Sequence, residues 1–177
     1  MIYYGAKEIA ASCRTVRGNT IIIAKEIPED KYDFKPVPEY RSVARMLTHI
    51  ALSYRFQHQI HGVEKRTNFE GFDFPSLMQQ LVQEESVART KDQLVDLLQN
   101  EGEKWAVWAE GLSDEFLAER FDMPEGATPS FKSRFEMIIS VKEHEMHHRG
   151  QLMLVQRMLG IVPHLTRERE ARMAESK

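Results

Sequence analysis

Residues 131–159 read FKSRFEMIISVKEHEMHHRGQLMLVQRML, and this stretch gives the clearest indication of the fold. Its core positions recur every three or four residues, the spacing of one buried face of an α-helix. The series is Met137, Val141, His144, His148, Leu152, Val155 and Leu159. A glycine and then a proline follow, in the order typical of a helix end. We therefore predict one long helix with two histidines on its buried face.

Three other segments show the same periodicity. The first, 2–27, ends at Pro28, the second, 42–62, opens with a serine suited to an N-cap, and the third, 90–111, opens with a Thr-x-x-Gln capping box. A short amphipathic helix is expected at 76–87. No alternating run of β-branched residues indicates a strand. The predicted fold is all-α: a four-helix bundle with long connections and a short extra helix.

Length and composition restrict the class of protein. A chain of 177 residues is expected to form a single domain, which we place at 1–165, followed by a charged tail at 166–177. The only cysteine, Cys13, lies on the core face of the first helix and indicates a reducing compartment. The net charge is −3 and no block of basic residues stands out, so we do not expect binding to nucleic acid. No apolar run is long enough to span a membrane, and the start of the sequence does not resemble a signal peptide. We therefore expect a cytoplasmic protein that does not bind a membrane.

The histidine pair of the last helix suggests a metal site. Residues four apart on an α-helix differ by about 40° in direction, so His144 and His148 project from one face and can converge on a divalent ion. His49 lies at the edge of the second helix's inward face and is the best third ligand. His147 is displaced from the pair and would flank the site, or close it as a fourth ligand. The remaining histidines, expected at the surface or in loops, are His58, His61 and His164.

The same stretch contains the H-E-x-x-H pattern of zinc peptidases. In that reading Glu145 would be the general base beside a metal-bound water, which makes a metal-dependent hydrolase a minor alternative. Gln151 and Leu154 occupy positions where the longer peptidase pattern has Gly and His. Glu101, on the apolar face of the third helix, is a second weak catalytic candidate, although a place at the bundle edge is the simpler expectation.

Two segments together resemble a known family. The run EHEMHHRGQL at 143–152 resembles the last-helix signature of the DinB family within the DinB/YfiT-like superfamily, and SVARMLTHIA at 42–51 resembles its second-helix signature. The stretch IPEDKYDFKPVP at 27–38 resembles the family's first connection. The resemblance implies a four-helix bundle that binds a divalent metal through His49, His144 and His148, and that is frequently a homodimer.

The resemblance leaves the activity open. Some relatives are metal-dependent thiol transferases that use a low-molecular-weight thiol, such as bacillithiol or mycothiol, and a small electrophilic substrate. The first expectation is therefore a thiol S-transferase with zinc, nickel or iron as its metal. The alternative is a non-catalytic metal-binding module of a stress response. An open coordination position beside a cavity would favour the enzyme, and a fourth protein ligand would favour the module.

Overall fold

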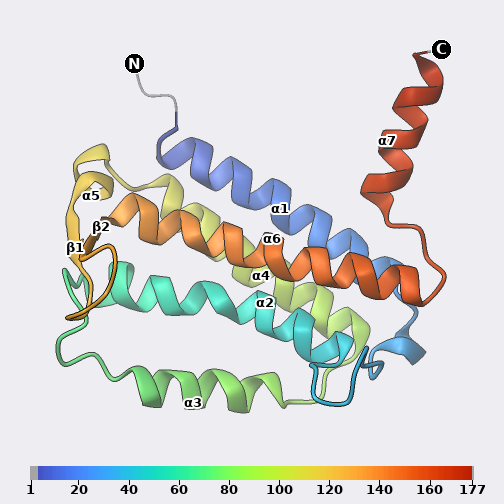
Figure 1. The fold of residues 1–177 in the computed structure, drawn as a ribbon, viewed down its shortest axis with the longest axis horizontal. Coiled ribbons are helices and arrows are strands. Elements are labelled where there is room, and N and C mark those ends of the chain that lie inside the picture. Colours follow the sequence, from blue (N-terminus) through green and yellow to red (C-terminus); the bar gives the residue numbers. More distant parts are fainter. Residues whose placement is uncertain (1–3, 177) are drawn as a thin grey trace.

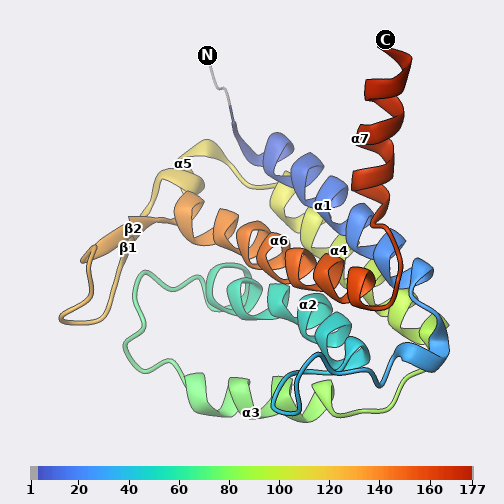
Figure 2. The ribbon, with the colours of Figure 1, turned by 45° about the vertical axis from the view of Figure 1, so that its right-hand side comes forward.

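The computed structural model describes residues 4–176, which form a four-helix bundle with shorter elements around it. The all-α prediction is confirmed. Figure 1 shows the four long helices side by side, and the turned view of Figure 2 agrees. These helices are α1 (Ala6–Glu26), α2 (Val43–His58), α4 (Lys91–Glu110) and α6 (Arg134–Met158). No helix within residues 4–176 has the length and apolarity that crossing a membrane requires.

The N-cap residues predicted from the sequence lie directly before the first residues of their helices. Ser42 accepts a hydrogen bond from the amide of Arg45 at the start of α2, and Thr90 forms a capping box with Gln93 at the start of α4. Ser133 forms a further capping box with Glu136 and begins α6. The last helix therefore starts three residues later than the predicted residue 131. At its other end Gly160 has a φ of +79°, a conformation that glycine adopts without strain.

Two short strands contradict the prediction that the chain contains none. Strands β1 (Arg120–Asp122) and β2 (Phe131–Ser133) pair antiparallel, with Phe121 opposite Lys132. Three residues are too few for an alternating pattern to be recognised in a sequence. The pair buries the side chain of Phe121 completely, so it closes one end of the bundle.

The remaining elements are connections and one external layer. Helix α3 (Phe74–Glu85), expected at 76–87, runs along α2 outside the bundle (Figure 1). The others are the 3-10 turn at Glu29–Lys31, the π-helix at Gln59–Val63, α5 (Asp114–Ala118) and α7 (His164–Glu175). Most of the residues predicted as a charged tail lie in α7, which projects away from the bundle in both views.

A buried ion pair crosses the centre of the apolar core. The Nε atom of Arg17 on α1 lies 3.0 Å from Oε1 of Glu145 on α6, and both side chains are at least 95% buried. Thr20 and Tyr54 also donate hydrogen bonds to the Glu145 carboxylate. A Cβ at Gly102 would lie 2.8 Å from Cγ of Arg17, which explains a glycine in the middle of α4.

Two histidines predicted at the surface are buried instead. His61 has no exposed surface, and its Nδ1 lies 2.9 Å from a guanidinium nitrogen of Arg134. His164 is 3% exposed, and its Nε2 lies 3.2 Å from Oδ1 of Asn19. Both lie outside the regular helix faces used for prediction, one in the π-helix and one at the first position of α7. His58, at the end of α2, is half-buried against Trp108.

His61 is expected to make the fold sensitive to acid. Burial, aided by the charge of Arg134, lowers its pKa from 6.5 to about 4. Between these values the unfolded chain binds more protons than the folded one, so stability falls as pH falls. Urea unfolding of metal-free protein at pH 7 and pH 5 should show a loss about 2 kcal/mol larger in the parent than in His61→Gln. His147→Gln, at an exposed histidine, is the control; equal losses in the parent and His61→Gln would refute the assignment.

Candidate metal centre

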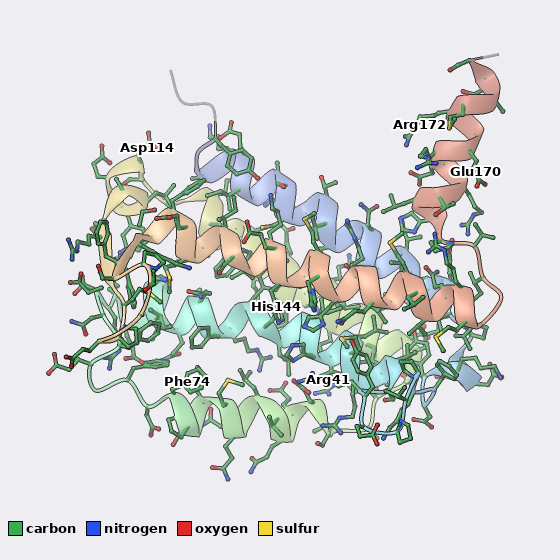
Figure 3. The ribbon with its side chains drawn as sticks, in the orientation of Figure 1. Arg41, Phe74, Asp114, His144, Glu170 and Arg172 are labelled. Carbon is green, nitrogen blue, oxygen red and sulfur yellow. The ribbon has the colours of Figure 1, made fainter. Side chains whose placement is uncertain are left out.

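Three histidines from two helices converge on one point. His49 comes from α2, and His144 and His148 come from successive turns of α6. The Nε2 atom of His144 lies 3.2 Å from Nε2 of His49 and 3.1 Å from Nε2 of His148. One ligand nitrogen from each residue lies within 4.8 Å of the other two, close enough for all three to hold one metal ion. Figure 3 shows His144 in the space between α6 and α2.

A carboxylate outside the cluster orients His49. The Nδ1 atom of His49 lies 2.6 Å from Oε1 of Glu85, the last residue of α3, and Arg41 donates to the other oxygen at 3.0 Å. Burial raises the pKa of Glu85, but the hydrogen bonds from His49 and Arg41 outweigh it and hold that pKa below its ordinary value. An ionised Glu85 accepts a hydrogen bond from Nδ1–H of His49, and this tautomer leaves the Nε2 lone pair facing the other histidines.

Gln151 orients His148 in the same way as Glu85 orients His49. Its Oε1 lies 2.7 Å from Nδ1 of His148, so that imidazole also presents Nε2 to the cluster. The amide nitrogen of Gln151 lies 3.0 Å from Nε2 of His147. His147 is exposed and bonded to this amide, so it does not lie with the three converging residues. The sequence had left it open as a fourth ligand.

The site favours the neutral form of His144 and His148. Burial, followed by the neighbouring histidines and Arg41, lowers the pKa of His144 from 6.5 to about 4. Burial also lowers the pKa of His148. Neutral imidazole is the form that binds a metal, because the lone pair is then free.

The cluster meets the requirements of a first-row divalent ion. Three nitrogens placed about 2.0–2.1 Å from a tetrahedral zinc ion lie roughly 3.3 Å apart, close to the two separations observed. Two imidazoles already carry a hydrogen-bonded partner on the far nitrogen. With their Nδ1 atoms protonated, His49 and His148 both present Nε2 as an acceptor toward Nε2 of His144. Nε2 of His144 carries at most one proton, so it cannot donate fully to both. A bound cation would satisfy all three lone pairs. The donor set therefore fits a metal.

The two carboxylates considered as catalytic groups lie elsewhere. Glu145 is fully buried and bonds to Arg17 on α1, so its carboxylate is directed into the bundle and away from the histidines. Glu101 is 8% exposed and pairs with Arg55 and Lys104. Burial raises the pKa of Glu101, but those two cations outweigh it and lower the pKa overall. This geometry gives the H-E-x-x-H reading no base beside the cluster.

A cavity of about 270 Å³ adjoins the cluster. It lies between α2, α3 and α6, and His49, His144 and Glu85 contribute to its wall. A small molecule bound there would contact the histidines directly. Because α3 supplies both Glu85 and one side of this cavity, the extra helix forms part of the site.

Sequence reasoning missed Glu85 and its partner Arg41. Glu85 ends a short amphipathic helix whose other glutamate, Glu84, looks the same in the sequence. Its only distinguishing property is the contact with His49, which lies 36 residues away along the chain. Gln151, in contrast, lies one helical turn from His148, so their proximity follows from helix geometry alone.

Removing the Glu85 charge should weaken metal binding. We expect Glu85→Gln to lower the zinc affinity about 10- to 100-fold, because loss of an outer hydrogen-bond partner of a ligating histidine has effects of that size. The measurement is competition against a chromophoric chelator. Glu84→Gln is the control, since this neighbouring glutamate pairs with Arg55 and Arg89 and not with a histidine. Equal affinities of the two variants would contradict the assigned role.

Comparisons with known proteins agree with this picture of the fold. A family model described as the DinB superfamily matches residues 13–152. A crystal structure of a DinB-like protein from Bacillus subtilis aligns with a TM-score of 0.62 at 24% identity, over 86% of this chain and 92% of that one. An uncharacterised protein from Clostridium difficile 630 aligns with a TM-score of 0.64 at 14% identity, over 89% and 98%. No curated protein sequence gives a significant match.

Proposed function

The chain belongs to the DinB superfamily, and from this premise we propose that it is a metal-dependent thiol S-transferase acting on small electrophiles. The observation that carries the proposal is the cavity that shares His49 and His144 with the histidine cluster. A metal with a purely structural role would need no adjoining cavity. In this reading His49, His144 and His148 hold zinc, nickel or iron.

The proposed reaction requires no nucleophilic side chain. A low-molecular-weight thiol loses its proton to solvent, its sulfur forms a bond to an electrophilic carbon, and the carbon–halide or epoxide carbon–oxygen bond breaks. A bound divalent metal would supply a Lewis acid that favours the thiolate at neutral pH. The halide leaves as an anion, or the opened epoxide oxygen takes a proton from water, so atoms and electrons balance.

The residues around the histidines have supporting roles. Glu85 and Gln151 fix the imidazoles that they contact, so the cluster is organised before any ligand binds. The apolar wall of the cavity excludes water from the electrophile and holds it beside the sulfur. Cys13, the only cysteine, is buried in the core, and burial raises its pKa, so it is not the thiol.

Metal content and thiol transfer test the proposal together. Metal per chain is measured by mass spectrometry on untagged protein. The protein is then incubated with 1-chloro-2,4-dinitrobenzene and cysteine, bacillithiol or mycothiol, and the thioether is followed by its absorbance. We expect metal-dependent acceleration with at least one thiol, lost on chelation and restored by zinc, nickel or iron. Metal-replete protein that accelerates none of these reactions would contradict the transferase and favour the metal-binding module.

A further inference from the structure

The cavity beside the histidines has an almost entirely apolar wall. Six of its side chains are hydrocarbon, thioether or aromatic groups: Leu52, Phe56, Phe74, Met78, Leu81 and Val141. The ring of Phe74 is 48% exposed and packs edge-on against Phe56, with centroids 5.6 Å apart. Figure 3 places Phe74 at the start of α3. One aromatic side chain of the wall is therefore also open to solvent, where a ligand could enter.

Gln57 is the polar residue of this wall that lies away from the histidine cluster and has an unpaired side-chain oxygen. It is only 7% exposed, and its buried Oε1 has no hydrogen-bond partner among residues 4–176. A buried amide without a partner is unfavourable unless a bound molecule or water satisfies it. The two serines of the wall are already paired, since Ser53 donates to the carbonyl of Ile50 and Ser140 to that of Met137. Nδ1 of His144, in the histidine cluster, is the other buried polar atom of the wall residues without a partner among residues 4–176. Gln57 therefore offers a free polar contact to a molecule in the cavity.

The volume of the cavity and the charges in its wall restrict the class of molecule that it can bind. A cavity of roughly 150 Å³ with apolar walls accommodates benzene, so about 270 Å³ suits one aromatic ring with a short substituent. Among the described residues, the only charged side chain in the wall is Glu85, which pairs with Arg41 and is hydrogen-bonded to His49. In metal-free protein an ionised ligand would lose its hydration here without gaining a counter-charge.

We propose that this cavity binds the electrophilic substrate as a small, uncharged, largely apolar molecule with one hydrogen-bonding group, and that Gln57 selects for that group. Gln57 lies about two turns of α2 beyond His49, so the polar group is at the end of the molecule remote from the reacting carbon. The amide can donate to a carbonyl or accept from a hydroxyl, depending on its rotation. The placement of the reacting carbon rests on the proposed function, but binding itself does not require the metal.

A matched pair of probes tests the role of Gln57. Benzyl alcohol and toluene differ by one hydroxyl group, and their dissociation constants are measured by ligand-observed NMR on metal-free and zinc-treated protein. The parent should bind benzyl alcohol up to about tenfold more tightly than toluene. Gln57→Leu should lose this preference while still binding toluene. Gln80→Leu, which changes an exposed glutamine of α3, should keep it. Benzoate should bind the metal-free parent more weakly than either probe.

A cavity-filling variant separates specific binding from adhesion to the surface. Ser53→Phe should abolish binding of both probes, and its thermal unfolding curve establishes that it is folded. Unchanged binding in Ser53→Phe, or a preference that persists in Gln57→Leu, would overturn the inference. Protein that binds no metal but discriminates the probes would refute the proposed function and support this cavity. Protein that binds zinc but neither probe would refute the inference alone.

Discussion

Replacing Glu145 by alanine is expected to destabilise the folded protein by about 3–5 kcal/mol, the range found when one partner of a buried ion pair is removed. The variant leaves the Arg17 guanidinium without its carboxylate in a site where that side chain is only 5% exposed. Thr20 and Tyr54 lose their common acceptor as well. Denaturant unfolding measures the change, and the melting temperature should fall by roughly 10 °C.

Two variants show whether the uncompensated charge is the cause. Glu143→Ala, at an exposed position of α6, should change stability by less than about 0.5 kcal/mol. The double variant Arg17→Met with Glu145→Leu should recover most of the loss, because apolar replacements of a buried pair are often close to neutral. A Glu145→Ala protein as stable as the parent would show that the pair is not important for the fold.

Replacing His144 by alanine is expected to have the largest effect on metal binding. Its Nε2 lies between those of His49 and His148, at 3.2 and 3.1 Å, so the variant removes the central donor of the cluster. Loss of a residue that only hydrogen-bonds to a ligating histidine already reduces the metal affinity about 10- to 100-fold. Loss of this ligand should therefore exceed roughly 100-fold, and the purified variant should contain little metal by mass spectrometry.

His147→Ala is the matched control on the same helix. His147 is exposed, and its Nε2 is bonded to Gln151 rather than directed at the cluster. We expect it to keep metal at the parent level. A His144→Ala variant with parental metal content would refute the assignment of the ligands. Metal-free parent protein that also ignores added zinc, nickel and iron would reduce the cluster to a buried polar network.

Helix periodicity was sufficient to predict most of the bundle. The apolar stripes and the caps at Ser42 and Thr90 predicted the four long helices. The first helix was expected from residue 2, which lies outside the described residues, and begins at Ala6, whereas the second was expected to reach residue 62 and ends at His58. Two features without a local signal were missed. The paired strands have three residues each, and His61 lies in a π-helix, where the spacing of an α-helix no longer indicates which face is buried.

Contacts between neighbouring residues of one helix could be predicted from the sequence alone. His144, His148 and Gln151 lie within two turns, so the rise and twist of the α-helix bring them together wherever that helix packs. The pattern also placed His49 on an inward face, but not at a particular distance from the other two. Its place on the second helix favoured this histidine as the third member, and the resemblance to the family implied the same trio.

The contacts between helices follow from tertiary packing and have no local signal in the sequence. Glu85 meets His49 across 36 residues, His49 meets His144 across 95, and Arg17 meets Glu145 across 128. Such contacts depend on how the helices cross and on how α3 lies along α2, which no local repeat specifies. The same packing buried Glu145 and left Gln57 facing a cavity. A charged or amide side chain has the same identity in the sequence whether water, an ion pair or a ligand satisfies it, and only packing selects among the three.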